Sequence, residues 1–584
     1  MYIPILSAVF SVSMSVIKRH TKQKGQQVNQ KRSYFHFFYI LLLGSLLLSF
    51  NSQAASYTWN GSVSTDWNTA ANWTPAAVPA STDDVTINTV SVNRYPVLAA
   101  NTTLNSFTLN SGSIDLAGFI LTCNGTTTLK GGTFGSSLTK GEIKALGGTT
   151  SFGSATTSVT INTLVTVIGP VVSGMQNTTF NEIVNITKNG GYLESANGNN
   201  VFKENVTITM TDGLRWALAQ NYPDTFYKDL TITINKPNWN YGVVIGKSVY
   251  KGNITTNILT AGVYLYGTQE ATGKLIIGQL GVQPYLYLTN FISQTTDPLL
   301  IELAGLPGGG NGGWVTLENC VFYGDVRLAG YQLSYKGCTF FRRAILQRST
   351  WVNGVPNPAR ASDWTTSWTP TANIPTPVAN PVNIGSDGIL LNTFHGPVYI
   401  MGIGWTISGL GNTTVRSVFN EEVTINNGAN GYTFNISANT TADVFNKKLI
   451  LTGSGYNMRF GTNGAVTTLG EGVILDATGL YGGLQLEKIV FKGTTERQLT
   501  LTGTTSAYFG TGFVSEGPLT VTAPHLYFNG GKFLKSSTFT KTVAGDNVST
   551  GGNVFTDKAL IRNRASSGTI QMATQVKDQT VKSQ

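Results

Sequence analysis

The stretch Thr225-Phe226-Tyr227-Lys228-Asp229-Leu230-Thr231-Ile232 carries a pattern that returns along much of the 584-residue chain. An aromatic residue is followed four positions later by an aliphatic residue and usually, six positions later, by a second one. The aromatic residues of the successive copies are Phe180, Phe202, Phe226, Tyr250, Phe322, Phe340, Phe419, Phe445 and Phe555. The first four are 22, 24 and 24 residues apart. A repeat of this length, carried by short β-branched segments between Gly and Asn turns, is typical of a solenoid.

The parity of the pattern indicates which side chains are inside. The aromatic residue and the residues four and six positions later point to one face of a strand, and those at the third and fifth positions point to the other. One turn of about three short strands cannot bury its apolar face alone, but stacked turns cover one another at roughly 4.8 Å spacing. The sequence therefore predicts an all-β fold: a parallel β-helix (β-solenoid) of about 20 turns, on the order of 100 Å long, with an aromatic column inside.

The charge of the chain is unevenly distributed. Lys and Arg number 39 against 29 Asp and Glu, for a formal net charge of +10. Six of the basic residues precede Tyr34, where no acidic residue occurs, so the rest of the chain carries only a small excess of 33 basic over 29 acidic residues. A basic surface for nucleic acid is therefore not expected.

The basic segment is followed by an apolar one. Residues 37–50 form an uncharged run of 14 residues, which is short for a membrane span and suits the core of a signal peptide. Small residues follow, so we expect cleavage near Ala54 or Ala55. Residues 1–55 are accordingly predicted to be a signal peptide with a long basic n-region, and the mature protein to be secreted or held at the cell surface without a membrane span. An N-terminal membrane anchor is the alternative.

The remaining chain divides by composition. We expect a Trp-rich N-terminal cap at 56–100, a first β-helix block at 101–348, a Trp- and Pro-rich excursion at 349–381, a second β-helix block at 382–565 and a disordered polar tail at 566–584.

The predicted cap contains the motifs Trp59-Asn60-Gly61, Asp66-Trp67-Asn68, Asn72-Trp73-Thr74-Pro75 and Asp83-Asp84-Val85-Thr86-Ile87. This opening resembles the N-terminal segment of secreted bacterial surface proteins of the β-helix, adhesin or autotransporter-like kind, especially those of Bacteroidota. The resemblance extends through the later repeats and implies a β-helix located outside the cell. The residues themselves indicate that the three Trp rings cover the open first turn of the solenoid. An aromatic platform for carbohydrate is the rival interpretation.

Two of the three cysteines share a position in the repeat. Cys320 and Cys338 each precede a motif Phe by two residues and are 18 residues apart. Stacked turns would bring their Cα atoms to about 5 Å, within disulfide range. A bridge and two stacked thiols both remain open. No CxxC pair or His-rich spacing occurs, so we expect no metal and no cofactor.

Three charged residues near the short turns form the best enzymatic candidate. Asp325 and Arg327 are predicted to point outward after Phe322, and Arg343 to point outward one turn later, stacked on Asp325. An outward Arg as base, with carboxylates holding a cation against a uronate, is an arrangement that a β-helix polysaccharide lyase can use. An ordinary surface ion pair explains the same residues, and only one carboxylate is present. We therefore do not expect a catalytic centre.

A turn between two predicted strands offers exposed aromatic rings. Trp239 and Tyr241 lie in the segment 235–241, and sugar rings stack well on such side chains. The alternative is a turn that packs back on the solenoid.

These observations leave three functional hypotheses. The leading one is an exported, non-catalytic β-helix that acts as an adhesin or structural stalk at the cell surface. The alternatives are a polysaccharide lyase or hydrolase on a β-helix, and a carbohydrate-binding module. The expected partner is an extracellular glycan or another surface ligand.

Overall fold

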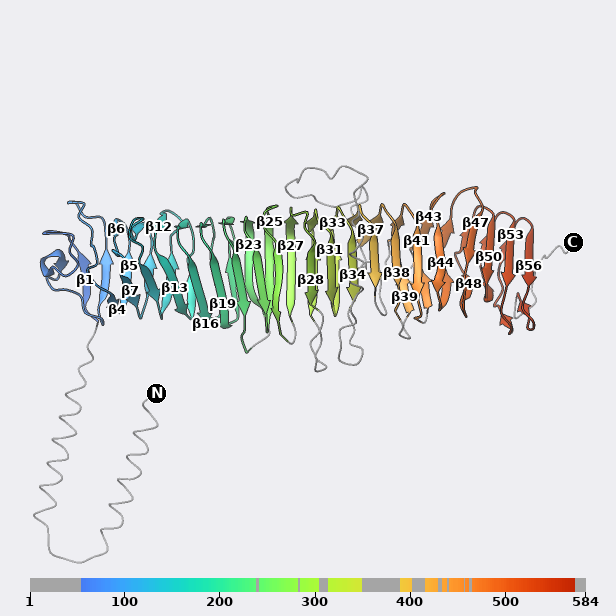
Figure 1. The fold of residues 1–584 in the computed structure, drawn as a ribbon, viewed down its shortest axis with the longest axis horizontal. Coiled ribbons are helices and arrows are strands. Elements are labelled where there is room, and N and C mark those ends of the chain that lie inside the picture. Colours follow the sequence, from blue (N-terminus) through green and yellow to red (C-terminus); the bar gives the residue numbers. More distant parts are fainter. Residues whose placement is uncertain are drawn as a thin grey trace, which may run out of the picture. The chain divides into compact units, whose positions relative to one another are not determined.

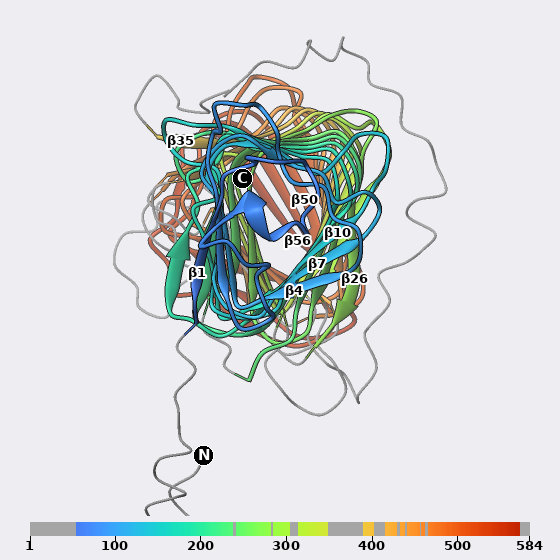
Figure 2. The same ribbon diagram turned by 90° about the vertical axis from the view of Figure 1, so that its left-hand side faces the viewer.

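The fold is that of a computed structural model, which describes residues 54–237, 241–281, 284–303, 313–348, 389–401, 415–428, 433–437, 441–455, 457–461 and 465–572. The chain divides into two units, Met1–Ala55 and Ser56–Gln584. In the described ranges the second unit consists of strands β1 to β57 and one short 3-10 helix, η1 (Ala70–Asn72). Its strands follow one another along a single axis in chain order (Figure 1), and a view along this axis shows successive turns lying over one another (Figure 2).

The strands form ladders that run along the axis. The first ladder contains, in order of pairing, β14 (Val171–Ser173), β11 (Thr149–Phe152), β8 (Thr127–Leu129), β5 (Ser106–Leu109), β3 (Asp84–Ile87), β1 (Ser56–Trp59) and β2 (Trp73–Thr74). The second contains β26 (Leu275–Leu280), β24 (Ile254–Ile258), β22 (Leu230–Ile234), β19 (Val206–Asp212), β16 (Val184–Asn189), β13 (Leu164–Gly169), β10 (Glu142–Ala145), β7 (Ile120–Cys123) and β4 (Thr102–Leu104).

A third, much longer ladder carries the aromatic residues of the motif. Its strands are β6 (Ser113–Ile114), β9 (Gly132–Phe134), β12 (Val159–Ile161), β15 (Thr178–Phe180), β17 (Leu193–Ser195), β18 (Val201–Phe202), β20 (Arg215–Leu218), β21 (Asp224–Phe226), β23 (Gly242–Tyr250), β25 (Gly262–Gln269), β27 (Tyr285–Ser293), β29 (Trp314–Glu318), β30 (Val321–Phe322), β32 (Gln332–Lys336), β33 (Thr339–Phe340), β35 (Leu390–Phe394), β37 (Val415–Phe419), β40 (Val444–Phe445), β43 (Thr467–Leu469), β46 (Ile489–Phe491), β49 (Val514–Ser515), β52 (Lys532–Phe533) and β55 (Val554–Phe555).

The remaining ladders belong to the later turns. They contain β28 (Leu299–Leu303), β31 (Val326–Gly330), β34 (Ala344–Arg348), β36 (Val398–Met401), β38 (Val423–Asn426), β41 (Leu449–Gly453) and β44 (Leu475–Leu480); β39 (Thr433–Ile436), β42 (Asn457–Phe460), β45 (Gly483–Leu486), β48 (Ser506–Gly510) and β51 (His525–Asn529); β47 (Arg497–Thr500), β50 (Leu519–Ala523), β53 (Ser537–Lys541) and β56 (Ala559–Asn563); and β54 (Asn547–Val548) with β57 (Ile570–Gln571). Among the described strand pairs, only β1 and β2 run antiparallel. The prediction of a parallel β-solenoid is confirmed, with about 19 turns.

The motif aromatics stack inside the solenoid as the parity predicted. Strand register pairs Phe180 with Phe202, Phe202 with Phe226, and Phe226 with Tyr250. The ring centroids are 4.8, 4.8 and 5.5 Å apart, and the planes are within 8° of parallel. All four side chains are buried. Stacking at this distance follows from the spacing of neighbouring parallel strands.

The column is interrupted and then resumes. Tyr250 is in register with Gln269, Gln269 with Ser293, and Ser293 with Phe322. From Phe322 the rings continue through Phe340, Phe394, Phe419 and Phe445, with centroids 4.7 to 5.3 Å apart. Phe394 was not among the predicted members.

Asparagine residues support the corners. Asn177 and Asn199 both have positive φ angles, a conformation that Asn tolerates better than most residues. Asn199 Nδ2 donates to Asn177 Oδ1 of the previous turn at 2.7 Å. Inter-turn bonds between Asn side chains also join Asn110 to Asn88, Asn181 to Asn162 and Asn446 to Asn420.

The N-terminal end is closed by the predicted tryptophan cluster. Trp59, Trp67 and Trp73 are at most 2% exposed. Trp73 packs edge-to-face on both partners, at 4.9 Å from Trp59 and 4.7 Å from Trp67. The indole N–H groups of Trp59 and Trp73 donate to Arg94 O and Trp67 O, each at 2.8 Å. Because the rings are buried, the rival interpretation of an exposed carbohydrate platform is wrong.

The predicted segments map onto the structure as follows. Strands β1 to β3 lie within the predicted cap and share a ladder with β5. The predicted excursion at 349–381 lies outside the described residues, and β33 pairs with β35 across it. Strand β57 lies within the predicted tail. Among the described residues, no helix is long and apolar enough to cross a membrane.

Candidate functional site

The acidic and basic residues singled out as a lyase-like centre are brought together at one corner. Arg343 Nη2 lies 2.9 Å from Asp325 Oδ2, as the stacking of turns predicted. The backbone N–H of Arg343 also donates to Asp325 Oδ1 at 3.1 Å. The carboxylate therefore binds both the side chain and the backbone of the next turn.

The expectation that Arg343 points outward is wrong. Its side chain is only 5% exposed and that of Asp325 only 15%. Parity fails here because Arg343 lies at the corner that precedes β34, where the chain turns. Gly396 of the following turn packs on the backbone of Arg342 and Arg343, so that a Cβ at Gly396 would lie 2.4 Å from Arg342 C.

Arg327 is engaged by a different acid. Its Nε lies 2.9 Å from Glu302 Oε1, and Glu302 is in register with Ala329 on the neighbouring strand. The Arg327 side chain is 14% exposed. The structure thus separates the three predicted residues into two ion pairs rather than one open centre.

The two cysteines of the repeat are buried as free thiols, which is the second of the two arrangements left open by the sequence. Cys320 Sγ lies 3.2 Å from Leu288 O, and Cys338 Sγ lies 3.4 Å from Lys336 O. Burial, with Cys338 adjacent, holds the pKa of the Cys320 thiol well above its usual value. Cys123 is also buried and free.

The predicted ligand-binding turn is described only in part. Trp239 lies outside the described residues. Tyr241 is 54% exposed and has a positive φ of 53°. Its hydroxyl is close enough to Tyr264 to contribute to the raised pKa of that side chain. Tyr241 therefore borders a larger group of aromatic rings that the sequence analysis did not identify.

We call this group the tyrosine–tryptophan surface and define it as Tyr264, Tyr285, Tyr287 and Trp314. Its residues occupy outward positions on three successive strands, β25, β27 and β29: Tyr264 is in register with Tyr287, and Tyr285 with Trp314. The rings of Tyr264 and Tyr287 are parallel with centroids 4.3 Å apart, and those of Tyr285 and Trp314 are 5.3 Å apart. All four side chains are partly exposed.

Glycine creates room for one of these rings. A Cβ at Gly262 would lie 2.9 Å from Tyr264 Cε2, so the Tyr264 ring leans over Gly262 along its own strand. Burial, more than any other effect, raises the pKa of Tyr264, Tyr285 and Tyr287 above the usual value. The three hydroxyls are therefore neutral at physiological pH and can both donate and accept hydrogen bonds.

On the side of β29 and β32, the surroundings of this surface are polar but nearly uncharged. The outward residues next to it on β29 and β32 include Thr316, Gln332 and Ser334. The charged pair at the edge, Glu318 and Lys336, neutralises itself, with Lys336 Nζ 2.7 Å from Glu318 Oε1.

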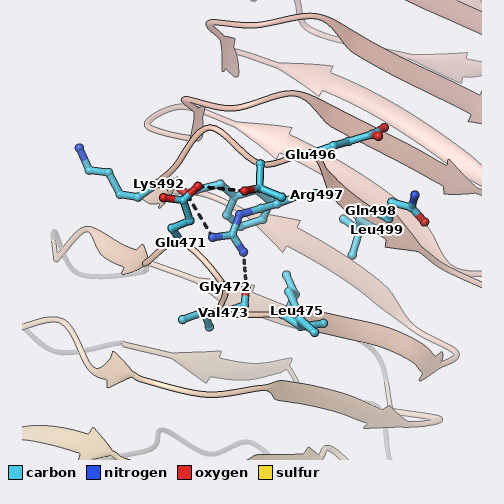
Figure 3. Close-up of a pocket in the computed structure, with 12 residues that line it drawn as sticks. Glu471, Gly472, Val473, Leu475, Lys492, Glu496, Arg497, Gln498 and Leu499 are labelled. Atoms are coloured by element: carbon cyan, nitrogen blue, oxygen red, sulfur yellow. Dashed lines mark hydrogen bonds between the residues drawn. The ribbon is translucent and has the colours of Figure 1, made fainter.

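A separate cavity of about 390 Å³ lies among the later turns, lined by 471–475, 491–492 and 495–499 (Figure 3). Arg497 is its central side chain. Arg497 Nη2 donates to Leu469 O at 3.0 Å and to Lys492 O at 3.2 Å, and the guanidinium also binds the carbonyl oxygens of Gly470 and Val473. Its Cζ lies 5.1 Å from the Phe491 ring centroid, and burial lowers its pKa.

Glycoside hydrolysis needs a protonated acid with a raised pKa, and at this cavity the pKa of Glu471 is shifted in the opposite direction. Thr495 Oγ1 donates to Glu471 at 2.9 Å, and hydrogen bonds from Thr494 and Thr495 lower the pKa of Glu471. Glu496 accepts a hydrogen bond from Thr520 at 2.6 Å, and its side chain extends away from Arg497 in Figure 3. Polar groups that line this cavity therefore bind one another.

The two histidines that follow the predicted leader have structural neighbours. The His395 ring stacks on Phe341 with centroids 5.0 Å apart, and the ring Nδ1 of His525 lies 3.1 Å from Asn547 Nδ2. Burial is the main reason why the pKa of each is lowered. Within the described ranges, no group of three or more His, Cys, Asp or Glu side chains is placed to hold a metal ion.

Comparisons with protein-family models, with curated proteins and with solved structures found no significant match. The class of the protein accordingly rests on its fold, a parallel β-solenoid.

The tyrosine–tryptophan surface left a signal in the sequence. Tyr264-Leu265-Tyr266 and Tyr285-Leu286-Tyr287 alternate aromatic and aliphatic residues within predicted strands. Since Leu265 and Leu286 belong to the core, their neighbours must point outward. The stacking across turns could not be predicted from this alternation, because it depends on which residues of successive turns are in register, Tyr264 with Tyr287 and Tyr285 with Trp314.

Proposed function

We propose that this protein is an exported, non-catalytic β-solenoid that acts as an adhesin or structural stalk at the cell surface. The observation that carries the proposal is the engagement of the best lyase-like residues in ion pairs. A catalytic base must reach the substrate, and Arg343 is only 5% exposed and bound to Asp325.

The outward surface supports a binding or spacing role. Along the second ladder, the outward residues Asn185, Thr207, Thr231 and Thr255 are in register on consecutive turns. Such columns repeat the same hydroxyl and amide groups along the axis. Many modest contacts of this kind bind through avidity rather than through one deep pocket.

The test uses the residues that the enzymatic hypothesis would need. Asp325→Asn and Arg343→Ala should leave attachment of protein-coated beads to cells or to glycan-coated surfaces unchanged, apart from a loss of thermal stability, because a partly buried ion pair is broken. Tyr192→Ala, at an exposed ring outside this corner, serves as the control for handling and coating.

An assay for unsaturated uronate products on polyuronate substrates completes the test. We expect no product with the unaltered protein. Product formation that disappears in Arg343→Ala would overturn the proposal and identify a lyase.

The carbohydrate-binding alternative is favoured by one specific observation, the tyrosine–tryptophan surface. Carbohydrate binding is compatible with the proposed adhesin role, because an adhesin needs a ligand-binding patch somewhere along its length.

A further inference from the structure

The tyrosine–tryptophan surface is not explained by the folding of the core. Along β25, β27 and β29 the inward residues, among them Leu265, Leu288 and Leu317, already form the continuous apolar interior. The four aromatic rings lie on the opposite side of the same strands. Large aromatic side chains that remain partly exposed on one patch are typical of ligand-binding surfaces.

The geometry of the rings suits a chain-like ligand. They occupy three consecutive turns, which extends the patch by roughly 10 Å along the axis, and two of them lie on one strand two residues apart, or roughly 7 Å. Tyr241 directly precedes β23, the strand that pairs with β25. A surface of this size accommodates several linked rings of a ligand rather than one small molecule.

The chemistry of the patch suits sugars without charge. The ring faces that Tyr264 and Tyr287 do not turn toward each other can bind the C–H faces of pyranose rings, while the phenol hydroxyls and the neighbouring Thr316, Gln332 and Ser334 can hydrogen-bond to sugar hydroxyls. At the edge formed by β29 and β32 the charges of Glu318 and Lys336 cancel each other at 2.7 Å, so an ionic ligand gains little there, while exposed Lys247 on β23, in register with Tyr266, is the charge at the opposite edge.

We propose that the tyrosine–tryptophan surface binds a neutral, unbranched oligosaccharide chain. The inference rests on the proposed function in that it names the ligand class of the adhesin. The rings are held in place by mutual stacking, at 4.3 Å for Tyr264 and Tyr287, so binding costs little side-chain entropy.

The experiment is affinity electrophoresis and calorimetry of the full chain with unbranched neutral glucan, mannan and xylan, and with polygalacturonate as the anionic comparison. We expect at least one neutral polymer to bind and polygalacturonate not to bind. Tyr287→Ala and Trp314→Ala should each weaken binding roughly tenfold, because each removes one stacking contact with the sugar. Tyr287→Phe keeps the ring and should stay within about twofold of the unaltered protein.

A matched control is available on another ladder. Tyr508 and Tyr527 form a stacked outward pair with centroids 4.4 Å apart, on β48 and β51. Tyr508→Ala removes the same kind of ring contact and should leave glycan affinity unchanged. Circular dichroism and thermal unfolding of every variant establish that the solenoid has formed.

Three outcomes would overturn the inference: binding to none of the neutral polymers, equal affinity of a folded Trp314→Ala variant, or tighter binding of polygalacturonate than of any neutral polymer. Sedimentation analysis adds a fourth, self-association of the chain that Tyr287→Ala abolishes, which would make the patch an interface between copies. Bead attachment is measured in parallel. Attachment without binding to neutral glycans would reject this ligand class while leaving the adhesin proposal in place.

Discussion

Asp224 shows how one buried carboxyl affects the interior of a β-solenoid. It is fully buried, and its Oδ1 accepts hydrogen bonds from Asn200 N at 2.8 Å and Asn200 Nδ2 at 2.9 Å. Its Oδ2 has no hydrogen-bond partner among the described residues. Burial raises the pKa of Asp224 to about 7, although the bonds from Asn200 act in the opposite direction.

The raised pKa predicts a definite pH dependence of stability. The pKa of an unfolded Asp is about 3.9, so between that pH and about 7 the folded state holds a proton that the unfolded state has lost. The free energy of unfolding should therefore fall as the pH rises through this window and level off above it. Asp224→Asn should make the thermal unfolding temperature much less dependent on pH over the same range. Burial also raises the pKa of Asp443, to about 6. In the Asp224→Asn variant, Asp443 therefore still makes the stability fall with rising pH, to a smaller extent.

An exposed carboxyl provides the comparison. Asp229→Asn, five residues along the same turn, should leave the pH profile of the unfolding temperature between pH 4 and 7 as it is in the unaltered protein. If Asp224→Asn also leaves the profile unchanged, Asp224 is ionised in the folded protein and the explanation by burial is wrong.

At the scale of a strand, the interruption of the aromatic column places polar side chains in the interior. Gln269 is fully buried where the column requires a ring, and neither its Oε1 nor its Nε2 has a hydrogen-bond partner in the described part of the chain. Ser293 is buried one turn later, and its hydroxyl likewise has no hydrogen-bond partner in the described part of the chain. Phe291 fills part of the space, at 6.4 Å from Tyr250 and tilted by 43°.

Gln269→Leu should therefore stabilise the solenoid. It replaces an amide without partners by an apolar side chain of similar size, and an unsatisfied buried polar group costs about 1–3 kcal/mol. We expect a higher midpoint in urea unfolding and slower amide hydrogen exchange in β25 and β27. Exposed Gln279 supplies the control, since Gln279→Leu should change neither. A lower midpoint for Gln269→Leu would mean that a bound water satisfies the amide.

The strands themselves were largely predictable, because period and parity are local properties. Phe226, Leu230 and Ile232 are buried and Asp229 is exposed, as the pattern requires. Phe394, with Val398 and Ile400, has the same pattern and was available to the same reasoning. The corners were not predictable: Arg343 follows the parity of an outward residue, but the chain turns there and the next turn covers it.

The tyrosine–tryptophan surface could not be predicted from local patterns either, because its contacts join different turns. Members on different strands are 21 to 50 residues apart in the sequence, so their contacts depend on the register between turns of different length. Outward orientation could be inferred from alternation, but proximity could not.

At the scale of the whole chain, the predicted signal peptide at 1–55 leads to a prediction of how the protein is processed. N-terminal sequencing of protein recovered outside the cells should give Ala55 or Ser56 as the first residue, because small residues follow the apolar run at 37–50. A variant with Leu43→Arg and Leu47→Arg interrupts this run and should remain inside the cells. Recovery of exported protein that retains residues 37–50 would show a membrane anchor instead.

The parallel pairing of each turn with the turn before it has a kinetic consequence. The tryptophan cluster and strands β1 to β3 form from the first residues of the solenoid, and they expose one ladder edge on which the next turn can pair. In the proposed export the chain emerges from the membrane N-terminus first, so each turn of about 24 residues follows the turn before it, and hairpin-sized elements form in microseconds. Each turn can therefore settle before the following one emerges. Folding then advances at the pace at which the chain is supplied, and a stalled or severed chain leaves a shorter solenoid whose last turn is its only unfinished part.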